Sequence, residues 1–132
     1  MVTAKAKWDR ELRFEGVGNT AHTLIMDSDG KVANSPMDLV LIALCGCTAV
    51  DVTTILKKKR EPFTTVEVSA EAEKAPTPPR VYTQIHLRYR VGGNVSRKAV
   101  EHAVRLSEEK YCSVAAMLHQ SAKISYEICL DS

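Results

Sequence analysis

The sequence predicts one α+β domain in the order three strands, a long helix, two strands, two short helices and a last strand. Apolar and polar residues alternate in several short stretches, as they do in half-buried strands. One long apolar run follows a helix start signal at Ser35. Strands and helices are grouped, which argues against a doubly wound parallel sheet. With 132 residues, the chain fits a single domain spanning residues 1–132.

Composition excludes several classes of protein. The 18 basic and 16 acidic residues leave a net charge of +2, far from the basic footprint of nucleic-acid binding. Residues 1–7 lack the apolar core of a secretory signal, and the apolar run from Leu39 to Val50 is too short to cross a bilayer. We therefore expect a cytoplasmic protein with neither a nucleic-acid nor a membrane partner. Because cytoplasmic thiols stay reduced, the four cysteines should serve packing, metal binding or redox chemistry.

The first third of the chain is predicted to form three strands. Residues 4–8 and 11–15 alternate between apolar and polar side chains, and residues 22–26 are apolar enough for a third strand. Residues 27–30, Asp-Ser-Asp-Gly, are typical of a turn.

A long central helix is the strongest signal in the sequence. Ser35 is a natural N-cap, Pro36 suits the first helical position, and Asp38 completes a capping spacing. The run 39–44 is apolar on every face, so the helix must be surrounded by protein. A single chain of this size would leave one apolar side of the helix exposed to water. We therefore predict a tight homodimer in which a second copy covers that side. The basic run 57–60 suits the negative end of the helix dipole.

The second half predicts a hairpin, two helices and a last strand. Residues 66–72 and 81–91 alternate cleanly, with Val81 and Thr83 assigned to the inward face. A helix over 96–109 should place Glu108 on its outer side, and a short helix over 113–119 follows a break near Tyr111. The final strand covers residues 124–130.

Cys47 lies inside the apolar helix, where a free cysteine is usually a small hydrophobic residue. Two neighbours favour a functional role instead. Gly46 costs helix stability, about 1 kcal/mol against alanine, which suggests close approach of a backbone or ligand. Asp51 lies one turn further on the same face and needs a partner, because burying a carboxylate alone is costly. A purely structural partner for Asp51 would serve equally well.

Cys112 lies at the predicted junction between the two short helices. A helix N-terminus and the nearby Lys110 both favour a thiolate, and Glu109 would oppose it. An inert cysteine at the junction is as consistent with the sequence. The histidines and cysteines lack the spacing of a zinc site, so no metal is expected.

At this point the chain resembles the OsmC/Ohr family. Residues 35–52 are similar to the central-helix motif of that family, and residues 107–114 to its second cysteine motif. The details are closest to the YhfA-type branch. The resemblance implies an intertwined homodimer with two equivalent sites at the interface and no organic cofactor. It also implies a thiol peroxidase in which Cys47 attacks an organic hydroperoxide and Cys112 resolves the sulfenic acid. A dithiol reductant would then restore both thiols.

The sequence departs from the peroxidase branches at two positions. Met37 stands where they carry a glutamate after the helix-start proline, and Asp38 points away from Cys47. No arginine lies between Arg13 and Arg60, where those branches use one to stabilise the thiolate. The alternative is therefore a non-catalytic dimer of the same fold that senses redox state or binds a small hydrophobic ligand. In a third interpretation the cysteines are bystanders. Met37, Asp51 and Glu109 are the residues expected to line the site.

Overall fold

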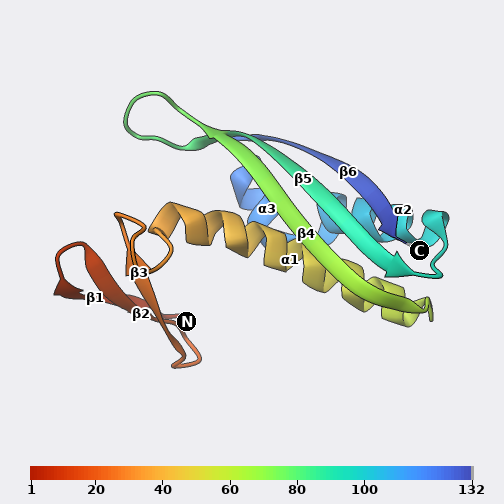
Figure 1. The fold of residues 1–132 in the computed structure, drawn as a ribbon, viewed down its shortest axis with the longest axis horizontal. Coiled ribbons are helices and arrows are strands. Elements are labelled where there is room, and N and C mark those ends of the chain that lie inside the picture. Colours follow the sequence, from red (N-terminus) through yellow and green to blue (C-terminus); the bar gives the residue numbers. More distant parts are fainter. Residues whose placement is uncertain (132) are drawn as a thin grey trace. The chain divides into compact units, whose positions relative to one another are not determined.

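The computed structural model describes residues 1–131 and confirms the predicted α+β class and element order (Figure 1). The elements are β1 (Lys5–Arg10), β2 (Arg13–Val17), β3 (Thr23–Asp27), α1 (Pro36–Lys58), β4 (Phe63–Lys74), β5 (Tyr82–Gly93), α2 (Arg97–Leu106), the π-helix η1 (Ser107–Tyr111), α3 (Ser113–Leu118) and β6 (Lys123–Asp131). The chain packs as two compact units, Met1–Ile42 and the part from Ala43 onward.

The first unit contains an antiparallel sheet in the order β1-β2-β3. The buried Asp27 closes its last strand and organises the next turn. Its carboxylate accepts hydrogen bonds from the backbone N–H groups of Asp29, Lys31 and Val32, each at 3.1 Å. Burial alone would raise the pKa of Asp27, but these donors and Arg13 hold it below its ordinary value. The predicted turn is therefore present and built around this side chain.

The long helix α1 begins and ends as the sequence predicts. The hydroxyl of Ser35 accepts from the backbone N–H of Asp38, and the Asp38 carboxylate accepts from the backbone N–H of Ser35, both at 3.1 Å. This reciprocal capping box satisfies two groups at the helix start. Lys57 and Lys58 occupy the last turn. One face is fully buried and repeats every four residues: Leu44, Thr48, Val52 and Leu56.

Another face of α1 is exposed, although its residues are apolar. Ile42 and Val50 are 51% and 64% exposed, and Gly46 lies between them at the same four-residue spacing. Among the described residues, α1 is the one helix long and apolar enough to cross a membrane by length and composition. The sequence argument against a membrane span considered only the apolar run from Leu39 to Val50, whereas α1 extends from Pro36 to Lys58. Core helices of soluble proteins pass the same test, so this is weak evidence for a membrane span.

The second unit contains the sheet β4-β5-β6. Strands β4 and β5 form the predicted antiparallel hairpin, and β6 pairs with β5 in parallel, with Leu87 opposite Tyr126. A parallel pairing requires a long crossover, which α2, η1 and α3 provide. On the outer face, Arg88 bonds to Glu127 of β6 at 2.7 Å.

The inner face of β5 departs from the prediction at its start. Tyr82 is buried there and Val81 is 39% exposed. The pairing shifts between Glu73 and Lys74, which leaves Thr83 as an extra residue in β5. Such a bulge reverses the inward and outward sides of the preceding residues. Beyond it the predicted alternation holds, with four buried residues: Ile85, Leu87, Tyr89 and Val91.

The crossover covers this inner face. The hydroxyl of Ser96 caps α2, whose buried stripe is Val100, Ala103 and Val104. The predicted continuous helix over 96–109 is interrupted, because the chain changes to a π-helix at Ser107. In the view of Figure 1, the helices α1, α2 and α3 lie behind the sheet of β4, β5 and β6.

Candidate functional site

The structure brings the two predicted site cysteines together within one chain. Cys47 is half-buried in the middle of α1, and Cys112 is 4% exposed at the junction of η1 and α3. The side chains of Cys112 and Cys47 are close enough to interact, and this interaction raises the pKa of Cys112. The contact joins segments far apart in sequence and is made without a second copy of the chain.

The π-helix η1 determines the position of Cys112. The backbone N–H of Cys112 donates to the carbonyl of Ser107 at 2.9 Å, which closes the wider π turn. Cys112 then serves as the N-cap of α3, and its sulfur accepts from the backbone N–H of Ala115 at 3.3 Å. Backbone contacts on both sides therefore hold the sulfur in place.

Cys112 is a thiol and not a thiolate at neutral pH. Burial is the main cause that raises its pKa to about 12, and the charges of Cys47 and Asp51 add to it. The N–H of Ala115 lowers the pKa without offsetting burial. Of the two alternatives that the sequence left open for Cys112, burial favours the protonated thiol over the thiolate that a helix start would stabilise. Lys110 lies over the exposed Tyr111 ring, 5.2 Å from its centroid.

Asp51 has the partner that the sequence argument required. Its carboxylate accepts a hydrogen bond from the hydroxyl of the fully buried Ser107 at 2.9 Å. Asp51 also forms part of the wall of a cavity of about 400 Å³. The other lining residues combine apolar side chains with two lysines: Thr54, Ile55, Lys58, Lys59, Leu106 and Tyr111. Asp51 thus connects this cavity with the thiol pair.

A second polar group lies beside the thiols and was missed from the sequence. The fully buried Tyr89 donates its hydroxyl to Glu108 Oε1 at 2.5 Å. Burial, followed by the hydrogen bond to Glu108, raises the pKa of Tyr89, and the charge of Cys112 raises it further. Tyr89 therefore remains protonated and lies within electrostatic reach of Cys112.

Glu108 is turned inward, contrary to the prediction. The expectation assumed an ordinary helical spacing through residue 109, whereas the π turn rotates the residues after Leu106. Burial raises the pKa of the half-buried Glu108, while the Tyr89 hydrogen bond and the charge of His119 lower it. The inward position of Tyr89 was readable from strand alternation, but its pairing with Glu108 was not.

The other two predicted site residues, Met37 and Glu109, lie on different elements. Met37 lies half-buried in the first turn of α1, within the first compact unit. Glu109 is exposed on η1. A side chain added at Gly46 would meet no heavy atom within 4 Å among the described residues, so the approach expected there is not made within this chain. Burial raises the pKa of Cys45, which precedes Gly46.

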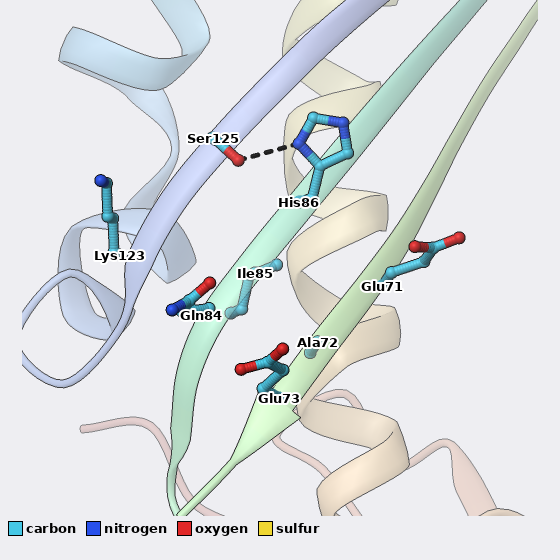
Figure 2. Close-up of a pocket in the computed structure, with 8 residues that line it drawn as sticks. All are labelled: Glu71, Ala72, Glu73, Gln84, Ile85, His86, Lys123 and Ser125. Carbon is cyan, nitrogen blue, oxygen red and sulfur yellow. Dashed lines mark hydrogen bonds between the residues drawn. The ribbon is translucent and has the colours of Figure 1, made fainter.

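A separate groove of about 410 Å³ lies on the sheet of β4, β5 and β6. Figure 2 shows its polar side chains, with His86 Nδ1 2.8 Å from the hydroxyl of Ser125. None of its lining residues is a cysteine: Glu71, Ala72, Glu73, Gln84, Ile85, His86, Lys123 and Ser125. The groove is therefore not part of the thiol site.

Comparison with known proteins adds to this geometry. The family model of OsmC-like proteins matches residues 28–127. Protein YhfA of Escherichia coli K12 is 43% identical over 131 residues, covering 96% of this chain and 98% of its own. The crystal structure of a hypothetical protein from Aquifex aeolicus is 31% identical, with a TM-score of 0.86 and coverage of 100% and 98%.

A more distant structure shares the fold. An organic hydroperoxide resistance protein, OsmC of Legionella pneumophila, has a TM-score of 0.71 at 13% identity, covering 98% of this chain and 96% of its own. The matched span and the identity to YhfA confirm the resemblance that the two cysteine motifs indicated. This chain belongs to the family of OsmC-like proteins.

Proposed function

We propose that the protein is a thiol-dependent hydroperoxide reductase in which Cys47 reacts with the peroxide and Cys112 resolves the product. The observation that carries the proposal is the interaction between the half-buried Cys47 and the buried Cys112. Proteins of the same fold that are named organic hydroperoxide resistance proteins support the choice of reaction.

The reaction consumes one hydroperoxide and two thiols. The Cys47 thiolate attacks the terminal peroxide oxygen, the O–O bond breaks, and the alkoxide takes a proton to leave as an alcohol. Cys47 is then a sulfenic acid, which the Cys112 sulfur attacks to form the Cys47–Cys112 disulfide. The proton of Cys112 and the hydroxide from Cys47 leave together as water. A dithiol reductant reduces the disulfide and is itself oxidised.

The peroxidase branches stabilise the reactive thiolate with an arginine that this sequence lacks between Arg13 and Arg60. Here the Cys112 thiol supplies part of that stabilisation. Because Cys112 keeps its proton at neutral pH, it can donate a hydrogen bond to a negatively charged Cys47. After oxidation of Cys47 the two sulfurs are already neighbours. Little movement is then needed for disulfide formation, which has strict geometric requirements.

The cavity beside Asp51 is the proposed approach for the peroxide. Its lining includes Ile55 and Leu106, which suit the organic part of a small hydrophobic hydroperoxide. We therefore expect kcat/KM for cumene hydroperoxide to exceed that for hydrogen peroxide. Equal values for the two peroxides would contradict this route.

The working form is proposed to be a cytoplasmic homodimer. The exposed stripe of Ile42, Gly46 and Val50 on α1 is apolar and open, which fits the same helix of a second copy. The cytoplasm keeps thiols reduced, as turnover by a dithiol reductant requires.

Turnover measurements test the reductase directly. With dithiothreitol as reductant, the wild type should consume cumene hydroperoxide, and Cys47→Ser should abolish consumption. Cys112→Ser should still oxidise Cys47 once, leaving a sulfenic acid that dimedone traps. Cys129→Ser, a half-buried cysteine on β6, is the matched control and should retain turnover. Undiminished turnover by Cys47→Ser would overturn the proposal.

A second candidate function is a non-catalytic dimer that senses redox state or binds a small hydrophobic ligand. It is favoured by Met37, which stands where the peroxidase branches carry a glutamate, and by the absence of an arginine between Arg13 and Arg60. This candidate predicts that a hydrophobic ligand raises the unfolding temperature while peroxide is not consumed. Catalytic consumption of hydroperoxide would exclude it.

A further inference from the structure

Ser107, the first residue of η1, is fully buried and has no part in the chemistry described above. Its hydroxyl donates to the carboxylate of the half-buried Asp51 at 2.9 Å. A hydroxyl is costly to bury unless it is hydrogen-bonded, and an alanine would fill this place without needing a partner. The hydrogen bond is therefore a specific link between η1 and α1.

This link lies close in sequence to both thiols. On α1, Asp51 follows Cys47 by one helical turn, which puts the two side chains on the same face. On η1, the carbonyl of Ser107 accepts from the backbone N–H of Cys112 at 2.9 Å. Ser107 thus contacts Asp51 through its side chain and Cys112 through its backbone.

The π turn makes the place of Cys112 depend on Ser107. The bond between them closes the wide turn, and such turns are rare and frequent at functional sites. Beyond the turn, the Cys112 sulfur accepts from the backbone N–H of Ala115 at 3.3 Å. Hydrogen bonds therefore run without a break from Asp51 on α1, through Ser107, to the sulfur of Cys112.

We propose that Asp51 and Ser107 are positioning residues of the thiol site. Their hydrogen bond holds η1 against α1 and so keeps the two sulfurs beside each other before Cys47 is oxidised. The inference rests on the proposed function, since it takes Cys47 and Cys112 as the reacting pair. A disulfide forms only within a narrow geometry, so ordering η1 in advance removes an entropic cost from that step.

The test measures the equilibrium of the two thiols with oxidised dithiothreitol at pH 7. The Cys47–Cys112 disulfide forms, and oxidised dithiothreitol takes up two electrons and two protons to become the dithiol. The disulfide is quantified by mass spectrometry of peptides after acid quenching. For Ser107→Ala we expect the equilibrium constant to fall about tenfold, because the disulfide must then order η1 itself. Ser113→Ala removes an exposed hydroxyl next to Cys112 and should leave the constant unchanged.

Two variants of Asp51 separate position from charge. Asp51→Asn keeps an acceptor for Ser107 and removes the charge, so its constant should stay near that of the wild type. Asp51→Ala removes the acceptor as well and should fall as far as Ser107→Ala. The double variant Asp51→Ala/Ser107→Ala should fall no further, since both changes remove the same hydrogen bond. A hydrogen bond that only stabilises the fold would lower the unfolding temperature and leave the constant unchanged.

The outcomes distinguish this inference from the proposed function. Glu108 of η1 is bonded to Tyr89 of β5, so Ser107→Ala should leave η1 attached to the sheet and carries the test if Asp51→Ala fails to fold. A wild-type constant for Ser107→Ala, or equal losses for Asp51→Asn and Asp51→Ala, overturns the inference. Absence of the disulfide in the wild type overturns it together with the proposed thiol site. A disulfide formed by oxidised dithiothreitol but not by hydroperoxide removes the reductase function alone.

Discussion

At the residue scale, two carboxyl–hydroxyl contacts lie within electrostatic reach of Cys112. Asp51 accepts from Ser107 on one side, and Glu108 accepts from Tyr89 on the other. Ser107 and Glu108 are consecutive in η1, so one short turn supplies both contacts. Each carboxylate therefore accepts from a fully buried hydroxyl, and removal of one partner should be costly.

Tyr89→Phe tests that cost. The phenyl ring retains its place against Tyr126, whose centroid is 5.9 Å away, but Glu108 loses its donor. We expect the free energy of unfolding at pH 7 to fall by about 1–3 kcal/mol, measured by urea denaturation.

The loss should depend on pH in a defined direction. Burial already raises the pKa of Glu108 in the folded protein, and loss of the donor raises it further. The raised pKa of Glu108 contributes to folding stability at pH values below its unfolded pKa of about 4.3. This contribution is lost as the pH rises through the pKa of Glu108 in the folded protein. The loss caused by Tyr89→Phe should therefore be smaller at pH 5 than at pH 7. Tyr126→Phe removes a more exposed hydroxyl, and equal losses for the two variants would contradict the account.

At the scale of elements, α1 has two faces with different requirements. The face of Leu44, Thr48 and Val52 is fully buried within the chain, while Ile42 and Val50 are exposed. The hydrophobic pattern of α1 alone could not distinguish these faces, because apolar residues surround the helix. The open space at Gly46 marks the side on which a second helix could approach closely.

Val50→Lys tests whether that side forms a subunit interface. In a monomer the substitution lies on the surface and should have little effect, whereas in the proposed dimer it buries an unpaired charge. We expect association to weaken by at least about tenfold, measured by sedimentation equilibrium. Val81→Lys, at another exposed valine, is the control and should associate like the wild type. A wild type that sediments as a monomer at micromolar concentration would contradict the dimer.

At the scale of the whole molecule, the sequence predicted the order of the elements more reliably than the surroundings of the two cysteines. Alternation and capping depend on local spacing, so the start of α1 at Pro36 and the inward set from Ile85 onward were predictable. The bulge at Thr83 and the π turn at Ser107 change the local period, which placed Val81 and Glu108 on the wrong sides. The protonation of Cys112 depends on burial by elements remote in sequence.

The central claim is that Cys47 and Cys112 form one redox unit, and a single measurement tests it most directly. The reduced protein is treated with one equivalent of cumene hydroperoxide, alkylated and digested, and its peptides are analysed by mass spectrometry. The account predicts a Cys47–Cys112 cross-linked peptide, with Cys45 and Cys129 still alkylated. Recovery of Cys47 and Cys112 as free, alkylated thiols would contradict it.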